Sequence, residues 1–204
     1  GSGTTFSVVR LRHAYLNLDW GTSALLLGQT WHPLYGDVAP QILNLNMAAP
    51  FQPFSRAPQI RYRYKTGDIQ ITGAALWQSQ YLSQGPEGKS QKYIKNSCVP
   101  EIYAGIDYKH KGLLIGAGIE MVSLTPRTQA TVEDKIYKVS ERITSLSYEV
   151  HMKYNSEKWL VAAKSVLGSN LTQTSMLGGY GIKSIDPRTG EQEYSPNRNS
   201  SSWI

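Results

Sequence analysis

Hydrophobic and polar residues alternate along most of the chain with a period of two, which is the period of a β-strand rather than of an α-helix. The clearest case is Ser145 to Tyr154, SLSYEVHMKY, in which every second residue is apolar or aromatic and the residues between them are hydrophilic. A second case is Pro58 to Lys65, PQIRYRYK, in which isoleucine and tyrosine alternate with arginine and lysine. Such segments predict strands with one apolar and one hydrophilic face, so the chain is predicted to be all-β.

Four short polar turns interrupt these strands at nearly equal intervals. The turns are DWGTS at 19–23, KTGD at 65–68, KHKG at 109–112 and NSEK at 155–158, and one marker residue from each lies 46, 44 and 46 positions from the next. The other connections are long and run roughly from 31 to 58, from 82 to 100, from 125 to 144 and beyond 167. This spacing predicts a repeated unit of strand, short turn, strand and long connection.

Strict alternation of short turns and long connections predicts an antiparallel up-and-down transmembrane β-barrel. Strands of about 9–11 residues cross a bilayer in such barrels, whereas a soluble sandwich usually has shorter strands, with turn signals every ~8–12 residues. Aromatic residues also lie near both ends of the predicted strands, as in the aromatic belts of membrane barrels. They are Trp20, Tyr64, Tyr108, Tyr154 and Trp159 near the turns, and Trp31, Trp77, Tyr81 and Tyr103 near the long connections. Ordinary enrichment of aromatic residues in strands is the alternative explanation.

Charged residues follow the polar face of the predicted strands. The sequence has 21 Lys and Arg against 15 Asp and Glu, a formal net charge of +6, which favours anionic partners. If the apolar face meets lipid, the opposite face lines a lumen with eight basic and three acidic residues. These are Arg10, Arg12, Arg61, Arg63, Lys65, Lys109, Lys153 and Lys164, against Asp107, Glu120 and Glu149. Such a lumen would attract anions, although the wet face of any sheet also carries solvated charges. The facing of the first strand stays open, because Arg12 shares the parity of Leu16.

Two segments carry a family resemblance. LRHAYLNLDWGTSALLLGQTWHP at 11–33 and, after a proline-rich connection, PQIRYRY at 58–64 resemble the DcaP-like porins of Gram-negative outer membranes. The resemblance implies a homotrimer of roughly sixteen-stranded barrels that passes small, often anionic, solutes. This chain is too short for that, since we expect about eight strands between residues 6 and 167 and up to two more after 177. We therefore predict a single β-barrel domain over 1–204, incomplete at one or both ends. A closed eight-stranded barrel is the alternative, but side chains would fill its lumen.

The connection from His32 to Pro58 is the longest that precedes a predicted strand. It holds five of the ten prolines and a run, QILNLNMAAPFQPF, that is too apolar for a wholly exposed loop. Because a long loop narrows the lumen of a porin, the resemblance makes this segment the constriction candidate, with Tyr35, Asp37 and Arg56 as its polar groups. The alternative is a surface loop or one that contacts a neighbouring subunit.

No catalytic or cofactor-binding pattern accompanies these strands. The four histidines lack metal-ligand spacing, Cys98 is the sole cysteine, and no serine lies in a G-x-S-x-G motif. Arginines and tyrosines in RYRYK would lie on opposite faces of a strand, which argues against a nucleic-acid surface. The sequence therefore predicts an outer-membrane porin: a passive channel, not an enzyme, without cofactor or metal, in contact with lipid and selective for small hydrophilic, anionic solutes. The alternative is a soluble or secreted β-barrel or sandwich that binds a small ligand.

Overall fold

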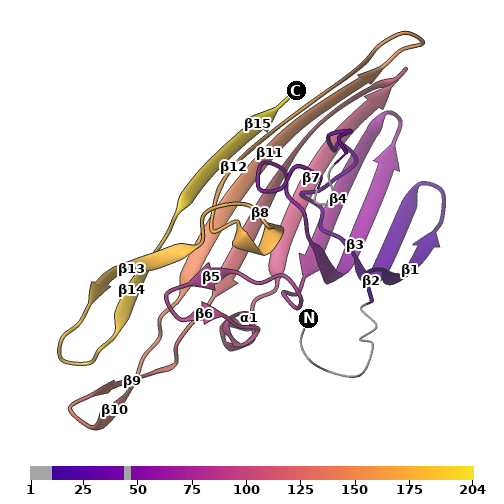
Figure 1. The fold of residues 1–204 in the computed structure, drawn as a ribbon. Helices are drawn as coiled ribbons and strands as arrows, with labels where there is room; N and C mark the ends of the chain where they lie inside the picture. The colour runs from indigo at the N-terminus through magenta and orange to yellow at the C-terminus, as the bar shows by residue number, and fades with distance from the viewer. Residues whose placement is uncertain (1–10, 44–46) are drawn as a thin grey trace, which may run out of the picture.

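The computed structural model describes residues 11–43 and 47–204, and one large antiparallel sheet dominates it (Figure 1). Its nine strands have the order β1-β2-β3-β4-β7-β8-β11-β12-β15. They are β1 (Ala14–Asp19), β2 (Ser23–Trp31), β3 (Arg56–Thr66), β4 (Ile69–Leu76), β7 (Glu101–His110), β8 (Leu113–Leu124), β11 (Ile143–Asn155), β12 (Leu160–Ser169) and β15 (Arg198–Trp203). Each strand pairs with the next strand of this sheet along the chain. The prediction of an all-β, antiparallel up-and-down architecture is therefore confirmed.

Short turns join the strands at one end of the sheet, and long connections join them at the other (Figure 1). The long connections carry small elements of their own. These are β5 (Gln84–Gly85), β6 (Gly88–Lys89) and helix α1 (Lys92–Ser97), then β9 (Gln129–Val132) and β10 (Lys135–Lys138), and finally the 3₁₀-helix η1 (Thr172–Thr174), β13 (Tyr180–Ile185) and β14 (Gln192–Pro196). Of the strands after residue 177, β13 and β14 pair with each other outside the main sheet, and β15 extends it. Within the described residues, no helix has the length and apolar character needed to cross a membrane.

Two of the short turns show why the chain reverses where it does. Gly21 has a φ of +85° and donates its N–H to Asp19 Oδ1 at 2.8 Å, and Gly67 has a φ of +56° between β3 and β4. Glycine adopts such positive φ values without the steric cost that a Cβ would add. The turns therefore fix the register in which the flanking strands pair.

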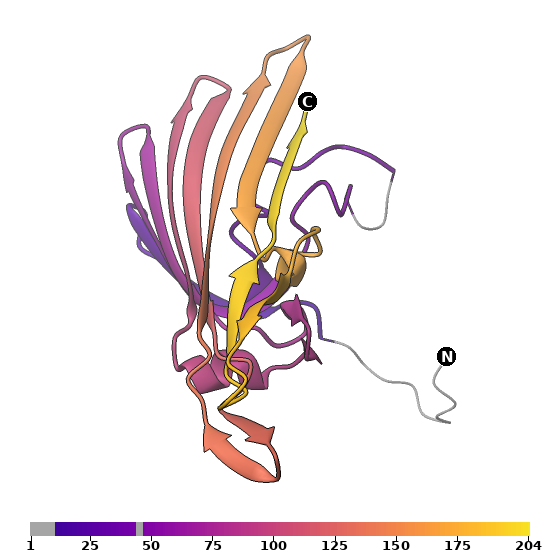
Figure 2. The ribbon, with the colours of Figure 1, turned by 90° about the vertical axis from the view of Figure 1, so that its left-hand side faces the viewer.

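The sheet is curved but not closed by the described strands. Among these, β1 pairs only with β2 and β15 only with β12, so both lie at an edge of the sheet. A view turned by 90° shows an open wall with segments of the chain on one side (Figure 2). The described residues thus form part of a barrel wall.

The two faces of this wall have the reverse of the polarity found in water-soluble proteins. On the convex face, Ile60 is 58% and Val150 is 55% exposed, whereas Glu120 on the concave face is only 1% exposed. Other exposed apolar side chains are Tyr62, Tyr64, Ile71, Ile102, Ile106, Tyr108, Ile115, Ile119, Leu146, Tyr148, Met152, Tyr154 and Leu167. Leaving one such side chain in water forgoes about 1.5–3 kcal/mol of burial free energy. A face of this composition suits lipid.

A long connection fills the concave side. The described parts of the segment between β2 and β3 lie on one side of the sheet (Figure 2), and Leu34 and Val38 within it are fully buried. Leu34 packs in a cluster with Leu76, Tyr103 and Val166 from three different strands. A second apolar cluster, which includes Ile94 of α1 and Leu124 of β8, lies beneath the other long connections. The hydrophobic cores are thus small and lie where connections meet the wall.

Candidate functional site

The candidate site is the concave face of the wall together with residues 32–43 and 47–55, which lie against it and are called here the inner loop. The inner loop approaches β3, β7 and β11 closely enough to leave only narrow cavities. One, of about 280 Å³, is lined by Trp31, His32, Asp37, Arg61 and Arg63 among others. A hydrophilic passage along the wall would therefore run beside these side chains.

Arg61 and Arg63 supply the unneutralised positive charge of this site. Both lie on the concave side of β3 and line the same two neighbouring cavities with Asp37. Arg61 donates from Nε to Gln59 Oε1 at 2.8 Å and from Nη2 to the carbonyl oxygen of Trp31. Among the described residues, no carboxylate lies within 4.0 Å of either guanidinium group. An arginine held by neutral acceptors keeps its full charge for an anion.

Two acidic residues of the wall near these arginines, Glu149 and Asp107, are by contrast paired with basic side chains. Glu149 is 2.8 Å from Lys164 Nζ and accepts a hydrogen bond from Tyr103 Oη, also at 2.8 Å. His151 Nε2 lies 2.9 Å from Asp107 Oδ1, and its Nδ1 lies 3.6 Å from Glu149. Since these carboxylates are neutralised locally, the cavities beside β3 keep a positive excess.

Several polar contacts hold the inner loop against the wall. Lys164 Nζ donates to the carbonyl oxygens of Leu34 and, at 3.2 Å, of Tyr35. Asp37 pairs with Lys109 Nζ at 3.0 Å. Burial raises the pKa of the Asp37 carboxyl, but Lys109, with Arg63 and Arg61 farther away, outweighs burial, so this pKa lies below its ordinary value. The inner loop is thus attached at its start to β7 and β12.

Its far end is attached in the same way. Trp203 Nε1 of β15 donates to Gln52 Oε1 at 2.8 Å. At the base of the loop, the Arg56 guanidinium lies 3.8 Å from the centroid of the Trp31 ring, and the Tyr35 ring stacks on Trp31 at a centroid distance of 4.3 Å. These cation–π and aromatic contacts stabilise the two chain segments where the loop leaves and rejoins the sheet.

A buried cluster of one histidine and two glutamates lies at the start of the inner loop. His32 Nε2 pairs with Glu101 Oε1 of β7 and lies 3.2 Å from Glu120 Oε1 of β8. All three side chains are almost completely buried. Gln78 Nε2 donates to Glu101 Oε2 at 3.2 Å, but within the described residues neither oxygen of Glu120 accepts a hydrogen bond. Burial lowers the pKa of His32, and the two carboxylates outweigh it and raise this pKa to about 9.

Sequence reasoning did not bring these three residues together. His32 and Glu101 are 69 positions apart, so no local metal-ligand spacing links them. The hairpin of β7 and β8 did offer a signal, because Tyr103 pairs with Glu120 in its register. Glu101 and Glu120 therefore lie on the same face of adjacent strands, which the KHKG turn and strand parity could have indicated.

The other predicted lumen residues occupy different surroundings. Arg12 precedes β1, is exposed, and has the parity of outward-facing Leu16 and Leu18, whereas Tyr15 and Asn17 face the cavity beside Arg61. Arg10 lies outside the described residues. Lys65 is exposed at the turn end of β3, and Lys153 is half-buried at the turn end of β11. Glu120 and Glu149 are buried in the polar groups described above. Of the three residues predicted for the constriction loop, Tyr35 contacts Trp31 of β2 and Asp37 contacts Lys109 of β7. Arg56 is the first residue of β3 rather than a loop residue.

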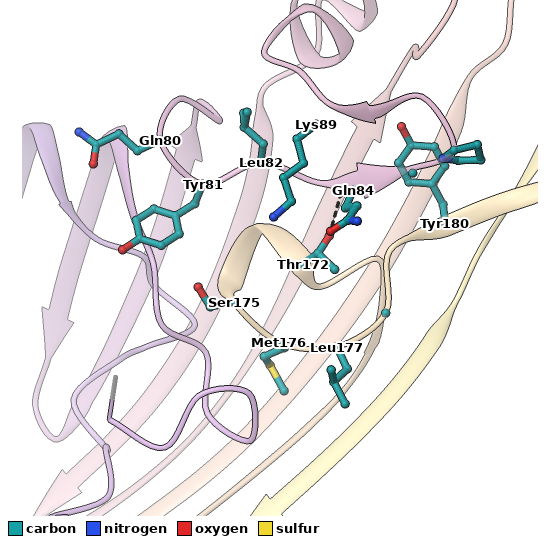
Figure 3. Close-up of a pocket in the computed structure, with 13 residues that line it drawn as sticks. Gln80, Tyr81, Leu82, Gln84, Lys89, Thr172, Ser175, Met176, Leu177 and Tyr180 are labelled. Carbon is teal, nitrogen blue, oxygen red and sulfur yellow. Dashed lines mark hydrogen bonds between the residues drawn. The ribbon is translucent and has the colours of Figure 1, made fainter. Parts of the chain in front are cut away.

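A larger cavity, of about 860 Å³, lies between the long connections (Figure 3). Its lining includes Tyr81, Leu82, Lys89, Met176 and Tyr180, so it combines apolar surface with one lysine. It lies at the end of the sheet from which the inner loop also starts. This cavity forms a hollow at the approach to the concave face.

Comparisons with known proteins support the fold. No family model matches this sequence, and no curated protein matches it. A solved structure, the crystal structure of the outer membrane channel DcaP of Acinetobacter baumannii, is similar to this one with a TM-score of 0.56 and 18% sequence identity. The alignment covers 84% of this chain and 48% of that channel, so this chain spans about half its length. The two proteins share a β-barrel fold, and the described residues correspond to part of its wall.

Proposed function

We propose that this chain forms part of a passive channel in a Gram-negative outer membrane, selective for small hydrophilic anions. The observation that carries the proposal is the inverted polarity of the wall: a broad apolar face is exposed and a charged face is turned inward. An antiparallel sheet of this kind is suited to contact lipid on one side and water on the other. The likeness to an outer membrane channel agrees with it.

The proposed selectivity for anions rests on the basic side chains that have no carboxylate partner. Arg61 and Arg63 lie side by side on the inward face of β3 with no carboxylate of the described chain within ion-pair distance. The inner loop narrows the space in front of them and brings Asp37 close, but Asp37 is paired with Lys109. Fixed positive charge beside low-dielectric walls raises the local concentration of anions.

Reversal potential in planar bilayers tests this proposal on the full-length protein. In a salt gradient the wild-type channel is expected to prefer chloride. The double variant Arg61→Glu, Arg63→Glu replaces two positive charges with two negative charges and should move the reversal potential towards the cation side. The matched control is Lys158→Glu, in the exposed turn between β11 and β12. An unchanged preference in the double variant would remove Arg61 and Arg63 from the mechanism.

The alternative, a soluble β-barrel or sandwich that binds a ligand, makes a different prediction about the convex face. With Ile60, Ile106 and Val150 in water, the protein would need to stay soluble and monodisperse without detergent. We expect instead that it requires detergent or lipid. The homotrimer, the single-domain organisation and the absence of catalysis remain predictions, and the mass of the detergent-solubilised protein, corrected for bound detergent, tests the first of them.

A further inference from the structure

With both of its carboxyl groups ionised, the group of His32, Glu101 and Glu120 would carry more negative charge than its surroundings neutralise. Glu101 and Glu120 are both almost fully buried, and their only ion-pair partner within 4.0 Å among the described residues is His32. One imidazolium offsets at most one carboxylate. Both oxygens of Glu120 also lack a hydrogen-bond donor in the described part of the chain. A buried carboxylate without such compensation is strongly disfavoured, so this group must take up a further positive species, which is either a proton held between the two carboxyl groups or a metal cation that displaces it.

The ligand atoms of these three residues are arranged to receive that species. One atom from each lies within 4.8 Å of the other two, and His32 Nε2 is 3.2 Å from Glu120 Oε1. Bonds of about 2.0–2.2 Å from zinc to imidazole nitrogen and carboxylate oxygen place neighbouring ligands roughly this far apart. One histidine and two carboxylates neutralise a divalent cation and leave a fourth position for water.

Neighbouring groups orient the ligands as partners of a metal site do. Gln78 donates to the second oxygen of Glu101 at 3.2 Å and is itself held by Ser83, whose hydroxyl accepts from Gln78 Nε2 at 3.1 Å. The Leu34 N–H donates to His32 Nδ1 at 3.2 Å, a contact that holds the ring only while Nδ1 is unprotonated. A carboxylate held through its other oxygen is a typical outer partner in metal sites.

We propose that His32 Nε2, Glu101 and Glu120 bind one divalent transition-metal cation of the Zn²⁺ class, which fastens the inner loop to the hairpin of β7 and β8. The imidazole favours Zn²⁺ over Mg²⁺ or Ca²⁺, which prefer all-oxygen sites. His32 belongs to the inner loop, and the carboxylates belong to the wall, so the cation would link the two. This site does not depend on what the channel transports.

Proton movements follow from the chemistry of the ligands. Nε2 must give up its proton to bind the cation, and the proton that remains on a neutral imidazole then sits on Nδ1. The Leu34 N–H loses its acceptor in that state, so the first turn of the inner loop must adjust when the cation binds. His32 also lines the cavity that holds Arg61 and Arg63, and their positive charge should slow entry of the cation.

Calorimetry with ZnCl₂ on the chelator-treated full-length protein in detergent tests the proposal. We expect about one Zn²⁺ per chain, with net proton release detected as a dependence of the binding enthalpy on buffer ionisation. MgCl₂ should give no comparable binding. The variants Glu120→Gln and His32→Gln should abolish binding, and Glu141→Gln, which alters a buried carboxylate outside this group, should retain it.

Gln78→Ala keeps all three ligands and should weaken binding about 10–100-fold. This variant keeps the test decisive if a ligand variant fails to fold, because unchanged Zn²⁺ affinity in Gln78→Ala would also contradict the proposed site. The proposal is overturned if the folded wild type binds no Zn²⁺, or if Glu120→Gln and His32→Gln bind it as the wild type does.

Discussion

Replacing Val150 with arginine tests whether the convex face lies in a bilayer. Val150 projects outward from β11, is 55% exposed, and pairs with Ala117 of β8 and Ser165 of β12. Thr144, also exposed on the outward face of β11, provides the matched control, because both residues are β-branched and lose similar strand propensity on replacement. The two positions differ in their distance from the ends of the strand.

Strand geometry gives the depth of each position. Thr144 and Tyr154 have the same parity and lie ten residues apart on β11. At ~3.4 Å per residue and a tilt of about 40°, this separation is roughly 26 Å along the barrel axis, close to the ~25 Å apolar band of outer-membrane barrels. If Tyr154 marks one interface, Thr144 lies near the other. Val150, four residues from Tyr154, then lies roughly 10 Å inside the band.

Depth determines the expected cost. Arginine on the lipid face of a barrel costs about 2–4 kcal/mol at the midplane and about 0–1 kcal/mol near an interface. We therefore expect Val150→Arg to lower the free energy of unfolding by about 2–4 kcal/mol and Thr144→Arg by less than about 1 kcal/mol. The larger change corresponds to roughly a 30-fold to several hundred-fold shift in the unfolding equilibrium. Urea unfolding of the full-length protein in phospholipid vesicles, followed by tryptophan fluorescence, measures both. Equal losses for the two variants would refute the placement of this face in lipid.

Three further predictions concern the concave side. Lys164→Met removes one member of a fully buried ion pair, so the free energy of unfolding should fall by about 3–5 kcal/mol. The same substitution removes a hydrogen-bond donor to the inner loop, so single-channel conductance should rise. An unchanged conductance would contradict the attachment of the inner loop by Lys164. Gly118→Ala places a Cβ 2.3 Å from Tyr103 Oη, whereas the Cβ of Gly73→Ala meets no atom within 4 Å. Urea unfolding should therefore show that the free energy of unfolding falls by about 1–3 kcal/mol in Gly118→Ala but not in Gly73→Ala. The lowered pKa of Asp37 means that its charge persists at neutral pH and is lost as the pH falls below the ordinary carboxyl range. The anion preference measured from reversal potentials should therefore rise in acid. Asp37→Asn should show a higher anion preference than the wild type already at neutral pH.

Strand parity made most of the wall predictable from the sequence. The alternation at Ile60, Tyr62 and Tyr64 indicated one face and that at Arg61 and Arg63 the other, and the structure places these sets on opposite sides of β3. This works because side chains on a strand have a strict period of two, so one apolar face fixes the position of every neighbour. The tight turns then fix which strands pair.

Contacts between distant parts of the chain lay beyond such reasoning. Lys164 and the carbonyl of Leu34 are 130 positions apart, and no periodicity relates a strand to an irregular loop that folds over it. The pairing of β13 with β14 outside the main sheet was missed for a related reason: a short alternating segment has the same pattern in a barrel wall and in a hairpin that belongs to a connection. Only packing against neighbouring elements decides between them.

Ion pairs on the concave face reduce the number of basic residues whose charge can act on a passing ion. By sequence, the lumen face carries eight basic and three acidic residues, but Lys164 is used by Glu149 and Lys109 by Asp37. An ion pair contributes little field at a distance, because its opposite charges cancel beyond their own separation. Selectivity at the inner loop should therefore depend on Arg61 and Arg63, rather than on the total excess of lysine and arginine. Neutralising Lys164 would alter the loop and the stability of the wall, whereas neutralising Arg61 would alter the ions that pass.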